Sequence, residues 1–219
     1  MIAGKGADND TCKILKHYLE RQDVGTALDV LDNDADIVAA FAWRTAYLTF
    51  EALKHRDVEK RSWNSLLVDF WRLSTAHSQY LVVKNFYEAV SSPSTKSSLN
   101  DPETSEVLHN LFRLHALHTL EREAADFFTS GAVTIRQITL ARTRAVMKLL
   151  DEIRPHAVRL VDSWSFPDWQ LDSSLGRYDG RVYEDLFHRA SEQNPVNDFT
   201  FDPYPFSDTL VKNERPSKL

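Results

Sequence analysis

Apolar residues recur at intervals of three and four along most of the chain, the spacing that gathers side chains on one side of an α-helix. One such stripe comprises Val38, Phe41, Ala42, Thr45, Leu48 and Ala52. In the helix expected over about residues 59–90, we expect the inner face to comprise Leu67, Phe70, Trp71, Ser74, His77 and Leu81. Similar patterns predict helices near residues 11–21, after residue 101, over 138–153 and over 182–193. Alternation of period two never persists, so the pattern predicts an all-α fold.

Two of these helices carry start signals in the sequence. Asp101 precedes Pro102, which predicts an N-cap followed by proline at the first helical position. Thr134 and Gln137 have the spacing of a capping box. Pro155 is expected to end or kink the helix that the capping box opens, because its ring excludes a normal helical hydrogen bond.

Long helices with short connections predict an antiparallel helical bundle of about five to six helices with an extended C-terminal tail. We expect three parts. Residues 1–33 hold a short helix and an acidic loop, and residues 34–193 form the bundle. Residues 194–219 contain four prolines and are expected to form the extended tail.

Composition and charge narrow the class of protein. The 219 residues are 42% hydrophobic and 26% charged, with a net charge of −6. This acidic balance argues against nucleic acid and anionic membrane surfaces as partners, because both attract basic patches. Cys12 is the single cysteine, so a thiolate metal cluster is not expected. No apolar run has the length of a membrane span, and residues 1–10 hold no apolar h-region, so we do not expect secretion.

Two groups of residues contain side chains that can ligate metal ions. Residues 32–36 read DNDAD and resemble the start of a calcium loop, but Ile37 and Trp43 occupy the positions that need glycine and glutamate. The acidic run is therefore expected to form the first turn of a helix. His109, His115 and His118 share one helix without an evident further ligand.

No nucleophile elbow, phosphate loop or dinucleotide glycine fingerprint is present. His77 is expected to be a hydrogen-bonded core residue rather than a base. The residues alone therefore predict no catalytic, cofactor-binding or metal-binding side chain.

The last three residues form a targeting signal. Ser217, Lys218 and Leu219 form the peroxisomal import tripeptide. We expect localisation in the peroxisome and binding to the peroxisomal import receptor.

Several ordered segments resemble the C-terminal helical domain of the peroxisomal acyl-CoA oxidase family. The most specific is residues 175–184, LGRYDGRVYE; residues 76–84, 137–139 and 153–162 are similar to the family in the same order. The resemblance covers about residues 29–219. It implies a dimeric flavoprotein of fatty acid β-oxidation, in which FAD and a glutamate base convert fatty acyl-CoA and O2 to trans-2-enoyl-CoA and H2O2.

The departure from the family is equally informative. The family's glutamate lies in a Glu-Gly-(Glu/Asp)-Asn-Thr stretch, and residues 7–11, ADNDT, are at best a degenerate echo of it without a glutamate. The resemblance therefore transfers no catalytic residue, and we expect FAD not to be bound by this chain alone.

We expect a structural and dimerisation role, with the catalytic half absent from the chain and the oxidase's catalytic domains or a homodimer partner as its contacts. The alternative is a stand-alone peroxisomal helical module that binds or regulates a full-length oxidase. Within the family motif, a structural role is expected for Gly176, Arg177, Tyr178, Asp179 and Gly180, because an Asp-Gly pair favours a turn with positive φ.

Overall fold

The structure is a computed structural model, which describes residues 10–23, 28–94, 97, 101–200 and 211–212. Their contacts divide the chain into two compact units, residues 1–157 and residues 158–219. The three-part division expected from the sequence stays a prediction.

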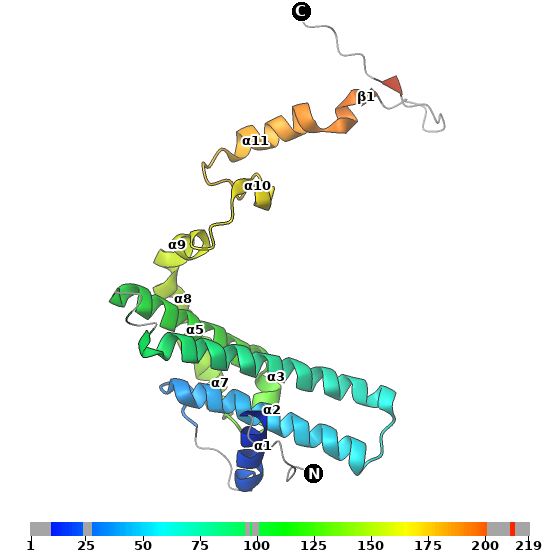
Figure 1. Cartoon of the computed structure of the whole chain (residues 1–219), viewed down its shortest axis with the longest axis vertical. Helices are drawn as coiled ribbons and strands as arrows, with labels where there is room; N and C mark the ends of the chain where they lie inside the picture. The colour runs from blue at the N-terminus through cyan, green and yellow to red at the C-terminus, as the bar shows by residue number, and fades with distance from the viewer. Residues whose placement is uncertain (1–9, 24–27, 95–96, 98–100, 201–210, 213–219) are drawn as a thin grey trace, which may run out of the picture. The chain divides into compact units, whose positions relative to one another are not determined.

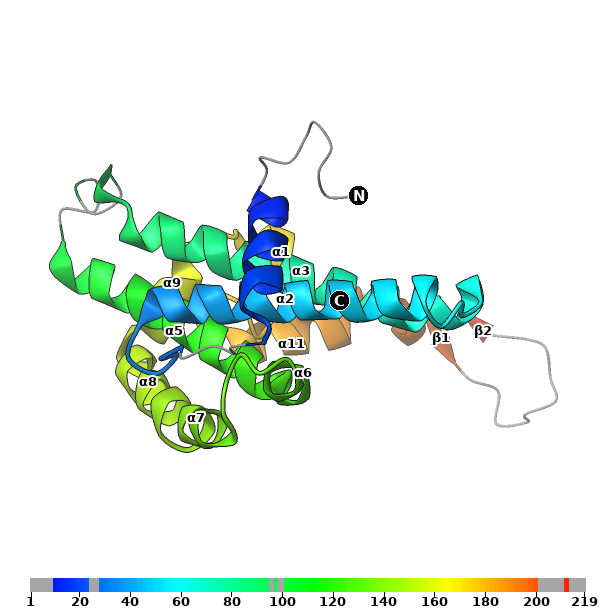
Figure 2. The same ribbon diagram turned by 90° about the horizontal axis from the view of Figure 1, so that it is seen from below.

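Unit 1 is a bundle of helices (Figure 1). Its helices are α1 (Asp10–Arg21), α2 (Asp34–Asp57), α3 (Trp63–Ser91), α5 (Pro102–Arg122), α6 (Ala124–Thr129), α7 (Ile135–Leu140) and α8 (Val146–Ile153). Helices α2 and α3 are neighbours, α3 also packs on α5, and α5 packs on α8. In Figure 2, α1 crosses the long axis of α2. The expected all-α bundle is confirmed.

The helix starts form as expected. The Asp101 carboxylate accepts hydrogen bonds from the backbone N–H groups of the first turn of α5. Thr134 and Gln137 make both hydrogen bonds of the capping box. The acidic run 32–36 begins α2, with the Asn33 side chain accepting from a backbone N–H at its N-cap. Negative side chains in this first turn complement the positive end of the helix dipole.

Helix α8 ends at Ile153, two residues before Pro155, as expected, and the chain continues in a different helix type. A π-helical turn, η1 (Ala141–Ala145), joins α7 to α8, and a 3₁₀ turn, η2 (Arg154–His156), contains the proline. Helix α9 (Ala157–Asp162) follows directly. A proline near the start of a helical turn needs no intrahelical N–H donor, which explains why the chain stays helical.

The inner face expected for α3 is wrong in register. The buried side chains of α3 are Leu66, Ala76, Tyr80 and Val83. Trp71 is 70% exposed, and Leu67 and Leu81 are exposed as well. Apolar residues occupy most sides of α3, so their spacing is compatible with more than one buried face. Packing against α2 buries a different face from the one expected from the sequence.

A buried arginine ties three helices of unit 1 together. The Arg44 guanidinium, from α2, is almost fully buried and lies 5.0 Å from the ring centroid of Phe127. It donates to Asp126 in α6 at 3.0 Å and to Glu123 at 3.2 Å, and to the Gln79 side chain in α3 at 2.5 Å. A buried charge is tolerated only when it is paired in this way.

Unit 2 consists of short elements. After α9 come α10 (Asp168–Leu171), α11 (Val182–His188), the π-helical turn η3 (Arg189–Gln193) and the 3₁₀ turn η4 (Pro195–Asp198). Strands β1 (Phe199–Thr200) and β2 (Val211–Lys212) pair antiparallel. The helix expected over residues 182–193 is thus present as α11 and η3. The import tripeptide lies outside the described residues.

Candidate functional site

The family motif, residues 175–184, forms the loop between α10 and the start of α11. Gly180 has a φ of +72°, a backbone conformation that residues with a Cβ rarely adopt. Its N–H donates to the Arg177 carbonyl at 3.3 Å, and the Val182 N–H donates to the Gly180 carbonyl at 2.9 Å. The Asp-Gly pair therefore makes the tight turn that the sequence predicts.

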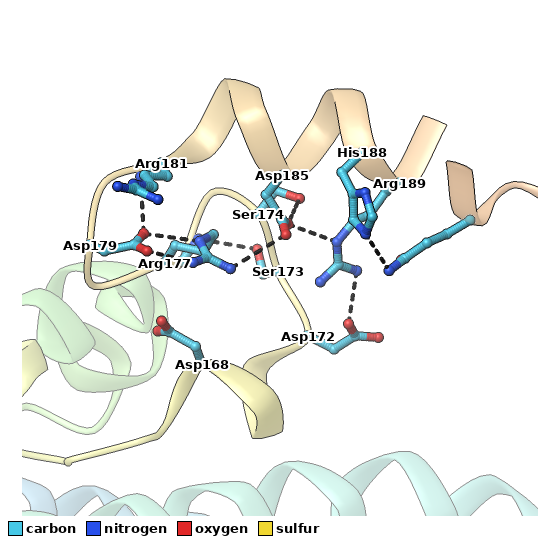
Figure 3. A network of polar contacts seen from close by, with 12 residues as sticks. Asp168, Asp172, Ser173, Ser174, Arg177, Asp179, Arg181, Asp185, His188 and Arg189 are labelled. Carbon is cyan, nitrogen blue, oxygen red and sulfur yellow. Dashed lines mark hydrogen bonds and ion pairs between the residues drawn. The ribbon is translucent and has the colours of Figure 1, made fainter. Parts of the chain in front are cut away.

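Arg177 and Asp179 lock this turn with a bidentate ion pair (Figure 3). Arg177 Nε lies 2.9 Å from Asp179 Oδ1, and its Nη2 lies 2.5 Å from Oδ2. Asp179 Oδ1 also accepts from the Arg181 backbone N–H at 3.0 Å. The hydrogen bonds from Arg177 and Arg181 lower the pKa of Asp179 from 3.8 to about 2. The same pairing raises the pKa of Arg177.

Asp185 of α11 is the second centre of the network in Figure 3. Its carboxylate accepts from Ser174 Oγ at 2.6 Å and from Arg189 Nε at 2.7 Å, and Arg177 Nη1 lies 3.4 Å away. These contacts, Ser174 first and then Arg189, lower the pKa of Asp185. Arg189 also donates to Asp172 at 2.8 Å, so the network fastens α11 to the end of α10.

Gly176, Arg177, Asp179 and Gly180 lie in this loop, and their structural role stays a prediction. The structure adds Ser174, Asp185 and Arg189, which the sequence reading did not select. The spacing of four between Asp185 and Arg189 is a signal that the sequence did contain. Ser174 has no such signal, because its contact depends on how the loop folds back.

Several large apolar side chains of this region are exposed. Tyr178 is 86% exposed, Tyr183 84% and Leu175 82%, while Phe187 and Trp169 are also exposed. Among the side chains that the structure describes in unit 2, no apolar one is buried, and only Ser174 is. The motif region thus combines a polar network with exposed aromatic side chains.

The charged side chains at the centre of this network are paired with one another. The cations Arg177 and Arg189 are already neutralised by carboxylates. The histidines considered as ligands lie in unit 1, where His109 contacts Asp34 and His118 lies 3.5 Å from Glu121. No cluster of three metal-ligating side chains occurs among the described residues. In the same described part, no helix is long and apolar enough to cross a membrane.

Comparison with known proteins identifies the fold. Residues 33–213 match the family model described as "Acyl-CoA oxidase". The chain belongs to the acyl-CoA oxidase family. Human peroxisomal acyl-coenzyme A oxidase 1 is 37% identical over 179 residues, which are 78% of this chain and 26% of the human protein. The koala (Phascolarctos cinereus) protein of the same name is 36% identical over 174 residues, 76% of this chain and 25% of that protein.

Solved acyl-CoA oxidase structures have the same helical architecture. Arabidopsis thaliana acyl-CoA oxidase 1 superposes with a TM-score of 0.74 and 28% identity, over 90% of this chain and 30% of that chain. Acyl-CoA oxidase-1 of Caenorhabditis elegans, solved with FAD and ATP, gives a TM-score of 0.72 and 27% identity over 89% of this chain and 29% of that one. The chain therefore spans about a quarter of the length of the curated relatives it matches.

Proposed function

We propose that this chain serves as the C-terminal helical part of a peroxisomal acyl-CoA oxidase. The reaction of the whole enzyme would convert fatty acyl-CoA and O2 to trans-2-enoyl-CoA and H2O2, with FAD as the electron carrier. The role of the present residues is structural: they dock on the catalytic domains and contribute to dimer contacts. Family membership supports the assignment, and the surface of unit 2 supports the role.

The exposed apolar surface of unit 2 is the observation that carries this proposal. Short helices in water gain most of their stability from burying an apolar face. In unit 2, however, Tyr178, Tyr183 and Phe187 are exposed beside a turn held by ion pairs. Burial against the catalytic domains would supply the missing stabilisation.

We propose that FAD binds outside the motif region. A dinucleotide pyrophosphate needs unpaired cations or a cradle of free backbone N–H groups. Arg177 and Arg189 are already paired, and the Arg181 N–H donates to Asp179. We therefore assign flavin binding and proton abstraction to the domains that the longer family members contain.

Association tests the structural role. The chain would be co-expressed with the human relative from which the matching segment has been removed, and separately with the intact relative. We expect co-purification with the truncated partner, and loss of it in Tyr183→Glu but not in Gln170→Glu, a matched exposed position on α10. Binding to the intact relative would instead support a regulatory module. Unchanged co-purification by Tyr183→Glu would contradict the proposed surface.

Activity tests the assignment of chemistry. The purified chain with added FAD and palmitoyl-CoA should release no H2O2 and should not retain flavin absorbance. Sustained peroxide release, or a yellow protein after gel filtration, would place the catalytic site within these residues and refute the structural role.

Localisation in the peroxisome is part of the same proposal. Several relatives are named peroxisomal, and the chain carries Ser217, Lys218 and Leu219 for the import receptor. A fluorescent protein fused to the N-terminus should co-localise with a peroxisomal marker, and deletion of Leu219 should disperse it. Fluorescence that stays in peroxisomes after the deletion would show that the tripeptide is not the targeting signal.

A further inference from the structure

A groove between α1 and α2 has the lining of a ligand site. It has a volume of about 450 Å³, and its apolar side includes Ile14, Ala42 and Trp43. Lys13, His17 and Arg21 line the same groove from α1. Ligand sites typically have volumes of roughly 300–1000 Å³ and combine an apolar lining with a few polar groups, and the groove matches this description.

The floor of the groove is fixed by packing. Trp43 Nε1 donates to the Ser130 carbonyl at 2.8 Å, which holds the indole in place. Tyr18 of α1 packs edge-on against Trp43, with ring centroids 4.7 Å apart, and stacks on Phe50 at 5.4 Å. These contacts hold α1 against α2 and leave the groove open beside them, so a ligand would not have to pay for ordering it.

The charge of the groove departs from that of the chain. Lys13, His17 and Arg21 are spaced by four residues, so they follow one side of α1. The lining contains no carboxylate, although the chain as a whole has a net charge of −6. Within the described part of the chain, neither His17 nor Arg21 has an ion-pair partner. His17 and Arg21 beside an apolar floor are complementary to an anion that carries an alkyl chain.

We propose that this groove binds a single-chain carboxylate amphiphile, with the alkyl chain on Trp43 and Ala42 and the carboxylate at His17 and Arg21. The site goes beyond the proposed structural role, because it would hold a small molecule rather than another domain. It also lies in unit 1, whereas the proposed docking surface belongs to unit 2.

Isothermal titration of the full chain with decanoate tests the site. We expect saturable binding of one decanoate per chain, and binding of decanol that is at least about tenfold weaker, because the neutral head loses the ionic attraction. Arg21→Glu should weaken decanoate binding by about tenfold or more. Lys16→Glu, which makes the same kind of charge change on α1 outside the groove lining, should change it by less than about twofold.

A space-filling variant completes the test. Ala42→Trp should abolish decanoate binding while far-UV circular dichroism shows an unchanged helix content. If this variant fails to fold, the comparison of Arg21→Glu with Lys16→Glu still decides the question. The proposal is overturned by an absence of saturable binding, by equal effects of the two charge variants, by equal binding of decanol, or by full binding in folded Ala42→Trp.

Discussion

Replacing Arg44 by methionine should destabilise unit 1 more than any other single charge removal in α2. The side chain is 2% exposed and makes four hydrogen bonds, two of them to Asp126 and one each to Glu123 and Gln79. Methionine is apolar, flexible and of similar volume, so the substitution removes the charge and the hydrogen bonds with a small cavity effect.

The loss of stability depends on which partners of Arg44 still have compensating contacts after the substitution. Removing one partner of a buried ion pair costs roughly 3–5 kcal/mol, because the other charge is left buried. Asp126 is 12% exposed, but Arg72 still lies 2.5 Å from its other oxygen, and Glu123 is 28% exposed to water. We therefore expect a loss near the lower limit, about 3 kcal/mol, or roughly 6–12 °C in Tm for a chain of this size.

Urea unfolding followed by far-UV circular dichroism measures this loss. Arg56→Met is the matched control, because Arg56 lies on the same helix and its pair with Asp57 is about half exposed. Exposed pairs contribute little, so the control should leave the unfolding midpoint unchanged. In a double variant, Arg44→Met with Asp126→Asn, the combined loss should be smaller than the sum of the two single losses. Equal midpoints for Arg44→Met and Arg56→Met would refute the reasoning.

Three further predictions concern the turns and the motif. Gly180→Ala should destabilise the motif turn by about 1 kcal/mol, because φ is +72° there. The added Cβ in Gly176→Ala meets only ordinary contacts, so its loss of stability should be smaller, and thermal melts of the two variants compare the losses. Thr134→Ala should cost about 1 kcal/mol by removing the capping box, and an unchanged urea midpoint would contradict this. The pKa of Asp179 is lowered to about 2 in the folded chain, below its value in the unfolded chain. The stabilising contribution of Asp179 is therefore present above about pH 4 and is lost as the pH falls through 2. An NMR titration of the Asp179 carboxyl carbon with a midpoint near 4 would contradict this.

Local features of this chain could be predicted from the sequence because each depends on a few neighbouring residues. The capping box at Thr134 and Gln137 and the N-cap at Asp101 formed as expected. The turn at Asp179 and Gly180 did so as well, since only glycine takes positive φ without strain. The resemblance identified the motif, but the partners Ser174 and Asp185 emerged only when the loop folded back on α11.

The sequence by itself determined that the chain is helical, where several of the helices begin and to which family it belongs. Only the tertiary structure decided which side of α3 faces inward, because Leu66 and Leu67 are both apolar and their helix has apolar residues on most sides. It also decided that Arg44 is buried, since the carboxylates that compensate its charge come from residues about 80 positions away. Helical periodicity is a local property, whereas the choice of a buried face and the pairing of buried charges depend on which distant helices pack together.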